Sequence, residues 1–97
     1  MRVLAQAIHV ARPEHRDDLL DAMRRMNAAA TGLDGLEAIG AFEDAENGRL
    51  VAMSLWQSPP AMQAGMSALG AVIADVPFGE WESAPASFTV LSEVAAE

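Results

Sequence analysis

The chain has 97 residues, of which 52% are hydrophobic and 21% are charged. This length predicts one domain over residues 1–97, and the composition excludes an intrinsically disordered chain. A formal net charge of −8 disfavours nucleic acids and anionic membrane surfaces as partners, because phosphate groups are bound by basic patches. The absence of cysteine excludes disulfides, thiolate metal sites and a thiol nucleophile.

The N-terminal segment lacks the pattern of a secretory signal. Its apolar run is interrupted at Gln6 and His9, whereas a signal peptide has a continuous apolar region followed by a cleavage site. No apolar stretch reaches the roughly 18 residues that a membrane-spanning helix needs. We therefore expect a cytoplasmic protein with no membrane partner.

The first third of the sequence predicts a strand followed by a helix. Residues 3–11 alternate between one face with Leu4, Ile8 and Val10 and another with Val3, Ala5, Ala7 and His9. Pro13 suits the first turn of a helix, and apolar residues recur at helical spacing from Glu14 to about Ala30. Asn27 interrupts this apolar stripe, either as an amide donor in a cleft or as a residue bonded within the helix.

The remaining residues predict a hairpin, a second helix and a last strand. Residues 36–43 and 49–57 read as strands around a turn at 44–48, where Asn47-Gly48 offers left-handed backbone. Ser58 is expected to cap a helix over residues 60–74, which has no charged residue and should be buried on more than one side. An irregular connection over 76–85, a strand over 87–94 and a frayed end at 95–97 complete the prediction.

This order predicts a ferredoxin-like βαββαβ α+β fold, with an antiparallel four-stranded sheet and two helices on one face. Such a sheet normally has one polar face, but the strands over 3–11 and 49–57 are apolar on both faces. The uncovered face of a monomer would be a large apolar patch. We therefore predict a homodimer through the sheet faces; the alternative is a monomer that tolerates the patch.

Short motifs are spread along nearly the whole chain: Ala11-Arg12-Pro13-Glu14, Leu19-Leu20, Gly35-Leu36, the turn at 44–48, Leu55-Trp56-Gln57-Ser58 and Val90-Leu91. With these motifs the sequence resembles the antibiotic biosynthesis monooxygenase family of dimeric α+β barrels. Members of that family include cofactor-independent monooxygenases of aromatic polyketides or quinol-like substrates, and other members degrade haem. The resemblance implies a site in the cleft between the sheet and the two helices.

Haem degradation is disfavoured for this chain. The haem-degrading members resemble it in having a tryptophan at the place of Trp56, but they also carry an asparagine on the first strand and a histidine on the second helix. Ala7 stands at the asparagine position, the second predicted helix has no histidine, and haem iron needs an axial ligand. His15 is expected at the surface, so the two histidines predict no metal site. No cofactor is predicted.

The resemblance implies a cofactor-independent monooxygenase acting on a small electron-rich aromatic. Trp56 would donate its indole N–H to a substrate oxygen, His9 would deprotonate a phenol or hold its oxyanion, and Asn27 would donate from the helix. The candidate substrate-binding residues are Ala5, Ala7, Met23, Phe42, Met62 and Met66.

Each candidate also has a purely structural interpretation. Trp56 and the methionines are equally typical of a core, and His9 could be satisfied by a backbone carbonyl or solvent. The competing hypothesis for the whole chain is a non-catalytic module that binds a small apolar ligand or only dimerises.

Overall fold

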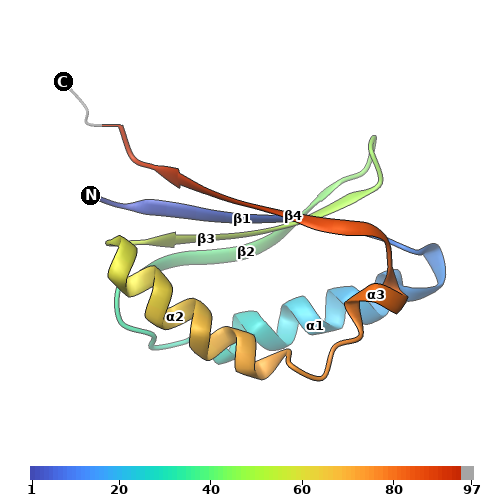
Figure 1. Ribbon diagram of the computed structural model, residues 1–97, viewed down its shortest axis with the longest axis horizontal. Helices are drawn as coiled ribbons and strands as arrows, with labels where there is room; N and C mark the ends of the chain where they lie inside the picture. Colours follow the sequence, from blue (N-terminus) through green and yellow to red (C-terminus); the bar gives the residue numbers. More distant parts are fainter. Residues whose placement is uncertain (95–97) are drawn as a thin grey trace.

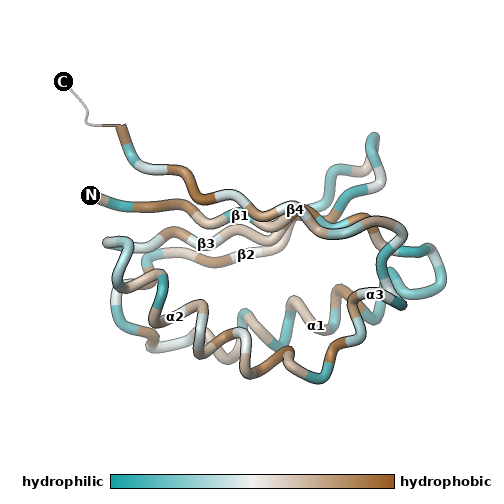
Figure 2. Tube along the Cα trace, in the orientation of Figure 1, coloured by the Kyte–Doolittle hydropathy of each residue, from teal (hydrophilic) through white to brown (hydrophobic). Residues whose placement is uncertain are grey.

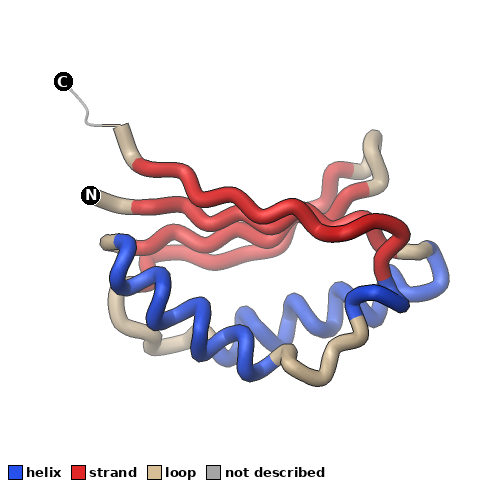
Figure 3. The backbone as a smooth tube through the Cα atoms, in the orientation of Figure 1, coloured by secondary structure: helices blue, strands red, loops and turns tan. Residues whose placement is uncertain are grey.

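The computed structural model describes residues 1–94. Its elements are β1 (Val3–Ala11), η1 (Pro13–His15), α1 (Arg16–Ala29), β2 (Leu36–Asp44), β3 (Arg49–Trp56), α2 (Pro59–Val72), α3 (Phe78–Trp81) and β4 (Glu82–Ser92). The strands form one antiparallel sheet in the order β2-β3-β1-β4, and the helices lie on one side of it (Figure 1, Figure 3). This confirms the predicted ferredoxin-like α+β fold. The expected fraying at 95–97 lies outside the described residues.

The turns and helix starts follow from local chemistry. Ser58 caps α2 as predicted, since its hydroxyl accepts a hydrogen bond from the backbone N–H of Ala61 at 3.3 Å. In the hairpin only Gly48 has left-handed backbone (φ 64°); Asn47 instead donates its side-chain amide to Asp44. The hairpin tip is accordingly polar in Figure 2.

Helix α2 is less enclosed than its composition suggests. Only Gly65 and Leu69 are fully buried, so the expectation of burial on more than one side is wrong for the described chain. The outward residues are small, which limits the apolar surface they expose: Ala64, Ser67, Ala68 and Ala71. Among residues 1–94, no helix combines the length and the apolar character that crossing a membrane requires.

Strand β4 begins earlier than predicted, because residues 76–85 are not an irregular connection. They contain the one-turn helix α3 and the first residues of β4, including Pro85. Proline cannot donate to a strand ladder, so it is tolerated at a sheet edge or a register shift. Both conditions hold: β4 pairs only with β1, and the pairing shifts between Ile8 and Val10.

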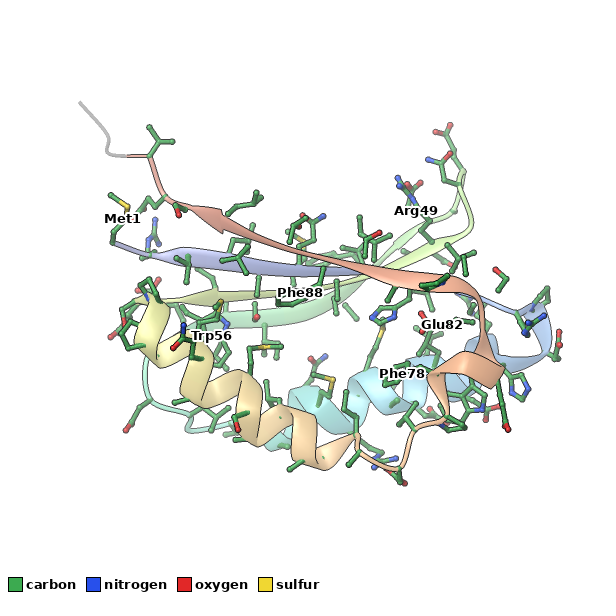
Figure 4. The ribbon with its side chains drawn as sticks, in the orientation of Figure 1. Met1, Arg49, Trp56, Phe78, Glu82 and Phe88 are labelled. Carbon is green, nitrogen blue, oxygen red and sulfur yellow. The ribbon has the colours of Figure 1, made fainter. Side chains whose placement is uncertain are left out.

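The strand register separates a covered sheet face from an uncovered one. Ala5 pairs with Ser54 and Ala7 with Ala52, and this face points to the helices. Two core clusters lie beneath the helices, one around Trp56 and the other around Leu19. They occupy opposite ends of the layer, as the labelled Trp56 and Phe78 show in Figure 4. The alanines of the central strands lie between them.

Candidate active site

A cavity of about 140 Å³ separates the two core clusters. Its floor consists of small residues on the central strands, and α1, α2 and α3 supply its walls. The side chains that shape it are Ala5, Ala7, His9, Ala52, Ser54, Met23, Met26, Asn27, Met66, Leu69, Phe78 and Phe88. An alanine side chain ends at Cβ, so the floor leaves space that larger residues would fill.

The polar side chains at this cavity are few. Only His9, Asn27 and Ser54 among the described lining residues carry nitrogen or oxygen in their side chains. Apolar walls with a few placed polar groups are typical of small-molecule sites, where the polar groups orient the ligand. These three residues come from β1, α1 and β3, so the tertiary fold brings them together.

His9 is held by a buried carboxylate. Its Nδ1 lies 2.7 Å from Oε2 of Glu82, and the two side chains are 13% and 5% exposed. A buried carboxylate is costly unless it is paired and hydrogen-bonded. His9 supplies that partner, and within residues 1–94 every buried polar side-chain atom has a hydrogen-bond partner.

Helix α3 positions both members of this pair. Glu82 follows α3 directly and pairs with Ala11 at the start of β4. The ring of Phe78 stacks on His9, with centroids 5.9 Å apart and an interplanar angle of 18°. Figure 4 shows Phe78 and Glu82 at the same end of the layer between sheet and helices. The imidazole is thus fixed by a hydrogen bond at one atom and by a ring contact on its face.

The carboxylate determines which nitrogen of a neutral His9 is basic. A carboxylate can only accept hydrogen bonds, so Nδ1 must carry the proton that it donates to Glu82. The lone pair then resides on Nε2, and His9 lines the cavity. A histidine whose tautomer is set by a carboxylate is suited to act as a general base.

Trp56 does not line the cavity, so the prediction that its indole N–H meets a substrate is wrong. The side chain is fully buried, and its Nε1–H donates to the hydroxyl of Ser54 at 2.8 Å. Its ring lies under α2 at Gly65, where an added Cβ would overlap the ring. Trp56 is therefore a core residue in this fold.

Trp56 nevertheless has a consequence for the site. Ser54 accepts the indole hydrogen bond, which leaves its own hydroxyl hydrogen to be donated elsewhere. Ser54 is 6% exposed and lines the cavity. Its hydroxyl is therefore a candidate donor to a ligand oxygen.

Two of the predicted substrate-binding residues lie outside the cavity. Phe42 pairs with Val51 on the uncovered sheet face and is 60% exposed; a strand's alternation decides this, since neighbours point to opposite faces. Met62 packs against the Trp56 cluster instead. The lining does include Ala5, Ala7, Met23, Met66, His9 and Asn27.

Solved structures of other proteins share the fold of this chain. No protein-family model and no curated protein matches the sequence. Rv0793 from Mycobacterium tuberculosis is 23% identical and superposes with a TM-score of 0.85, over 99% of this chain and 98% of that one. A putative antibiotic biosynthesis monooxygenase from Nitrosomonas europaea is 11% identical, with a TM-score of 0.76 over 96% of this chain and 99% of that one. The chain has the fold of the antibiotic biosynthesis monooxygenases.

The same monooxygenase fold includes SnoaB from Streptomyces nogalater, a cofactor-independent oxygenase. The SnoaB variant of known structure is 10% identical and gives a TM-score of 0.76, covering 98% of this chain and 95% of that one. At such identities the likeness concerns the fold, which is the one that the sequence motifs implied. What the cavity can bind depends on the side chains that line it in this chain.

Two residues of the candidate site, Glu82 and Ser54, were not predicted from the sequence. Glu82 lies between Trp81 and Ser83 in the segment predicted as an irregular connection, and nothing local shows that it is buried. Ser54 has a weak signal, since it alternates with Trp56 on an apolar strand. No group of three or more His, Cys, Asp or Glu residues arranged to hold a metal ion occurs in residues 1–94.

Proposed function

We propose that this protein is a cofactor-independent monooxygenase that oxidises a small electron-rich aromatic, a phenol or hydroquinone, in the cavity beside His9. The observation that carries the proposal is the His9–Glu82 pair, with its 2.7 Å hydrogen bond, at the wall of an otherwise apolar cavity. The fold of SnoaB, a cofactor-independent oxygenase, supports it.

In the proposed reaction, His9 Nε2 accepts the proton of a substrate hydroxyl. The resulting phenolate is electron-rich enough to transfer an electron to dioxygen, which is the co-substrate. For a hydroquinone, one oxygen atom replaces a ring hydrogen and the other leaves as water, giving a hydroxyquinone. The substrate supplies all four electrons, so the balance needs no other reductant.

The remaining polar groups have supporting roles in this proposal. The negative charge that develops on the substrate oxygen is stabilised by donors aimed at it in a site without bulk water. Asn27 carries an amide that makes no side-chain hydrogen bond within residues 1–94, and Ser54 has a hydroxyl hydrogen to donate. The Glu82 carboxylate stabilises the imidazolium that forms when His9 takes the proton.

Oxygen consumption by the pure protein tests the proposal. With a single-ring hydroquinone, we expect uptake above the uncatalysed rate. His9→Asn keeps an N–H near Glu82 but removes the base, so kcat should fall by about 10²–10⁴-fold, the usual contribution of a general base. Glu82→Gln should lower kcat while leaving substrate binding nearly unchanged.

His15 offers a matched control. Its Nδ1 lies 2.9 Å from Asp18 and its ring stacks on Trp81 at 5.9 Å, so it has the same two kinds of contact as His9 at a more exposed position outside the cavity. His15→Asn should therefore leave oxygen uptake unchanged. Uptake at the background rate with a panel of hydroquinones, phenols and anthrones would count decisively against a monooxygenase and favour a ligand-binding module.

We also propose that the working form is a homodimer through the uncovered sheet faces. Phe42 and Leu91 are 60% and 50% exposed on that face, and Leu4, Ile8 and Val51 lie between them. Apolar side chains gathered on one face are typical of an interaction surface. The dimer would leave the cavity on the opposite face of each sheet open to ligand.

A further inference from the structure

A second, wider hollow of about 690 Å³ adjoins the cavity along β1 and β4. Ala7, His9, Phe78 and Phe88 line both spaces, so the two meet at the His9 side chain. The second hollow also reaches Arg12, which lies three residues beyond His9, about 10 Å of extended chain. A ligand that fills the cavity can thus extend past His9 toward Arg12.

Arg12 differs from the other arginines of this acidic chain. Arg2, Arg16, Arg24, Arg25 and Arg49 each form an ion pair with a carboxylate. The guanidinium of Arg12 has no such partner in residues 1–94. In a chain of net charge −8, carboxylates are abundant, yet Arg12 is exposed and forms no ion pair within residues 1–94. Its guanidinium, beside the second hollow, is therefore available for an anionic ligand.

The cavity volume limits the aromatic part of that ligand. An apolar cavity of about 150 Å³ accommodates a benzene molecule, and this one measures about 140 Å³. The cavity holds one ring, and any further part of the ligand has to lie in the second hollow. We therefore place a single ring in the cavity and the rest of the ligand in the second hollow.

We propose that the substrate is a single-ring phenol or hydroquinone that carries a short carboxylate arm, with the ring in the cavity, its hydroxyl at His9 and the carboxylate at Arg12. This rests on the proposed monooxygenase function and specifies its substrate class. An arm attached to the carbon next to the hydroxyl-bearing carbon passes His9 in the direction of Arg12, as in a 2-hydroxyphenylacetate.

A monoanion fits this hollow better than a phosphate. Arg12 neutralises a single negative charge, and Glu82 also lines the hollow. A second ligand charge would face this carboxylate and the net negative chain without a partner. The guanidinium is planar and binds a carboxylate through two parallel hydrogen bonds.

Calorimetric binding under nitrogen tests the arm independently of turnover. The probes are 2-hydroxyphenylacetate and its methyl ester, which differ only in the charge of the arm. The wild type should bind the acid about tenfold more tightly than the ester, the gain expected of a charge-assisted hydrogen bond. In Arg12→Gln this preference should disappear, while affinity for the ester stays within about twofold.

Arg24→Gln is the matched control, because Arg24 is exposed and, within residues 1–94, pairs only with Asp21; it should keep the preference for the acid. Equal affinity of the wild type for acid and ester, or an undiminished preference in Arg12→Gln, would overturn the proposal. A preserved preference without oxygen uptake on 2,5-dihydroxyphenylacetate would instead refute the monooxygenase and leave the binding assignment intact.

Discussion

Single residues decide the shape of the core under α2. The ring of Trp56 lies where a side chain of Gly65 would be, so that an added Cβ would overlap the ring. Gly70 on the same helix has open space around it. The two glycines therefore have the same helix propensity but opposite packing constraints.

Exchanging each glycine for alanine separates these effects. Gly65→Ala should lower the free energy of unfolding by about 1–3 kcal/mol, because it overpacks the core. Gly70→Ala should raise it by about 0.5–1 kcal/mol through helix propensity alone. Urea denaturation followed by circular dichroism measures both; equal stabilities of the two variants would contradict the close packing of Trp56 on α2.

At the scale of elements, the ends of α1 and α2 are joined by polar contacts. Arg25 of α1 donates to the carbonyl of Val72 at 2.6 Å and to Asp75 at 2.9 Å. The hydrogen bond from Arg25 is the main cause that holds the pKa of Asp75 below its ordinary value of 3.8. This contact joins α1 to α2, the two helices that supply walls of the cavity.

The lowered pKa predicts an acid-dependent contribution of Asp75. The unfolded chain binds more protons at this group near and below pH 3.8, so the contact stabilises the fold above that pH and is lost as the pH falls through the folded pKa. Asp75→Asn should thus melt at a lower temperature than the wild type near neutral pH, and the difference should shrink on acidification. Asp34→Asn, at an exposed position without an ion pair in the described chain, is the control. A difference that stays constant with pH would exclude this linkage.

At the scale of the whole molecule, the uncovered sheet face sets the expected assembly. Phe42→Glu places a charge at the edge of that face on β2, so sedimentation velocity should show a shift from dimer toward monomer. Val94→Glu adds the same charge beyond β4 at a residue that is 88% exposed and should remain dimeric. A wild type that is monomeric at every concentration would contradict the dimer proposal.

Much of the fold could be predicted from the sequence, because it depends on local patterns. Strand alternation placed Ala5, Ala7 and His9 on one face, and Ser58 marked the start of α2. The exceptions have tertiary causes. Pro85 was placed at the end of an irregular connection, but it lies in β4 because that strand is at the edge of the sheet. Phe42 was assigned to the cleft, but its pairing with Val51 places it on the uncovered face.

Part of the candidate site could also be predicted from the sequence, and part of it could not. Its apolar floor and His9 could be read from the sequence, since small residues and a histidine alternate along one strand. Glu82 could not, because it meets His9 across 73 positions of the chain and its burial comes from packing of α3. Trp56 also required the structure, as only the approach of Gly65 and the bond to Ser54 show that its ring and N–H are already occupied. Local propensity determines which elements form; contacts between distant residues determine which side chains they bring together.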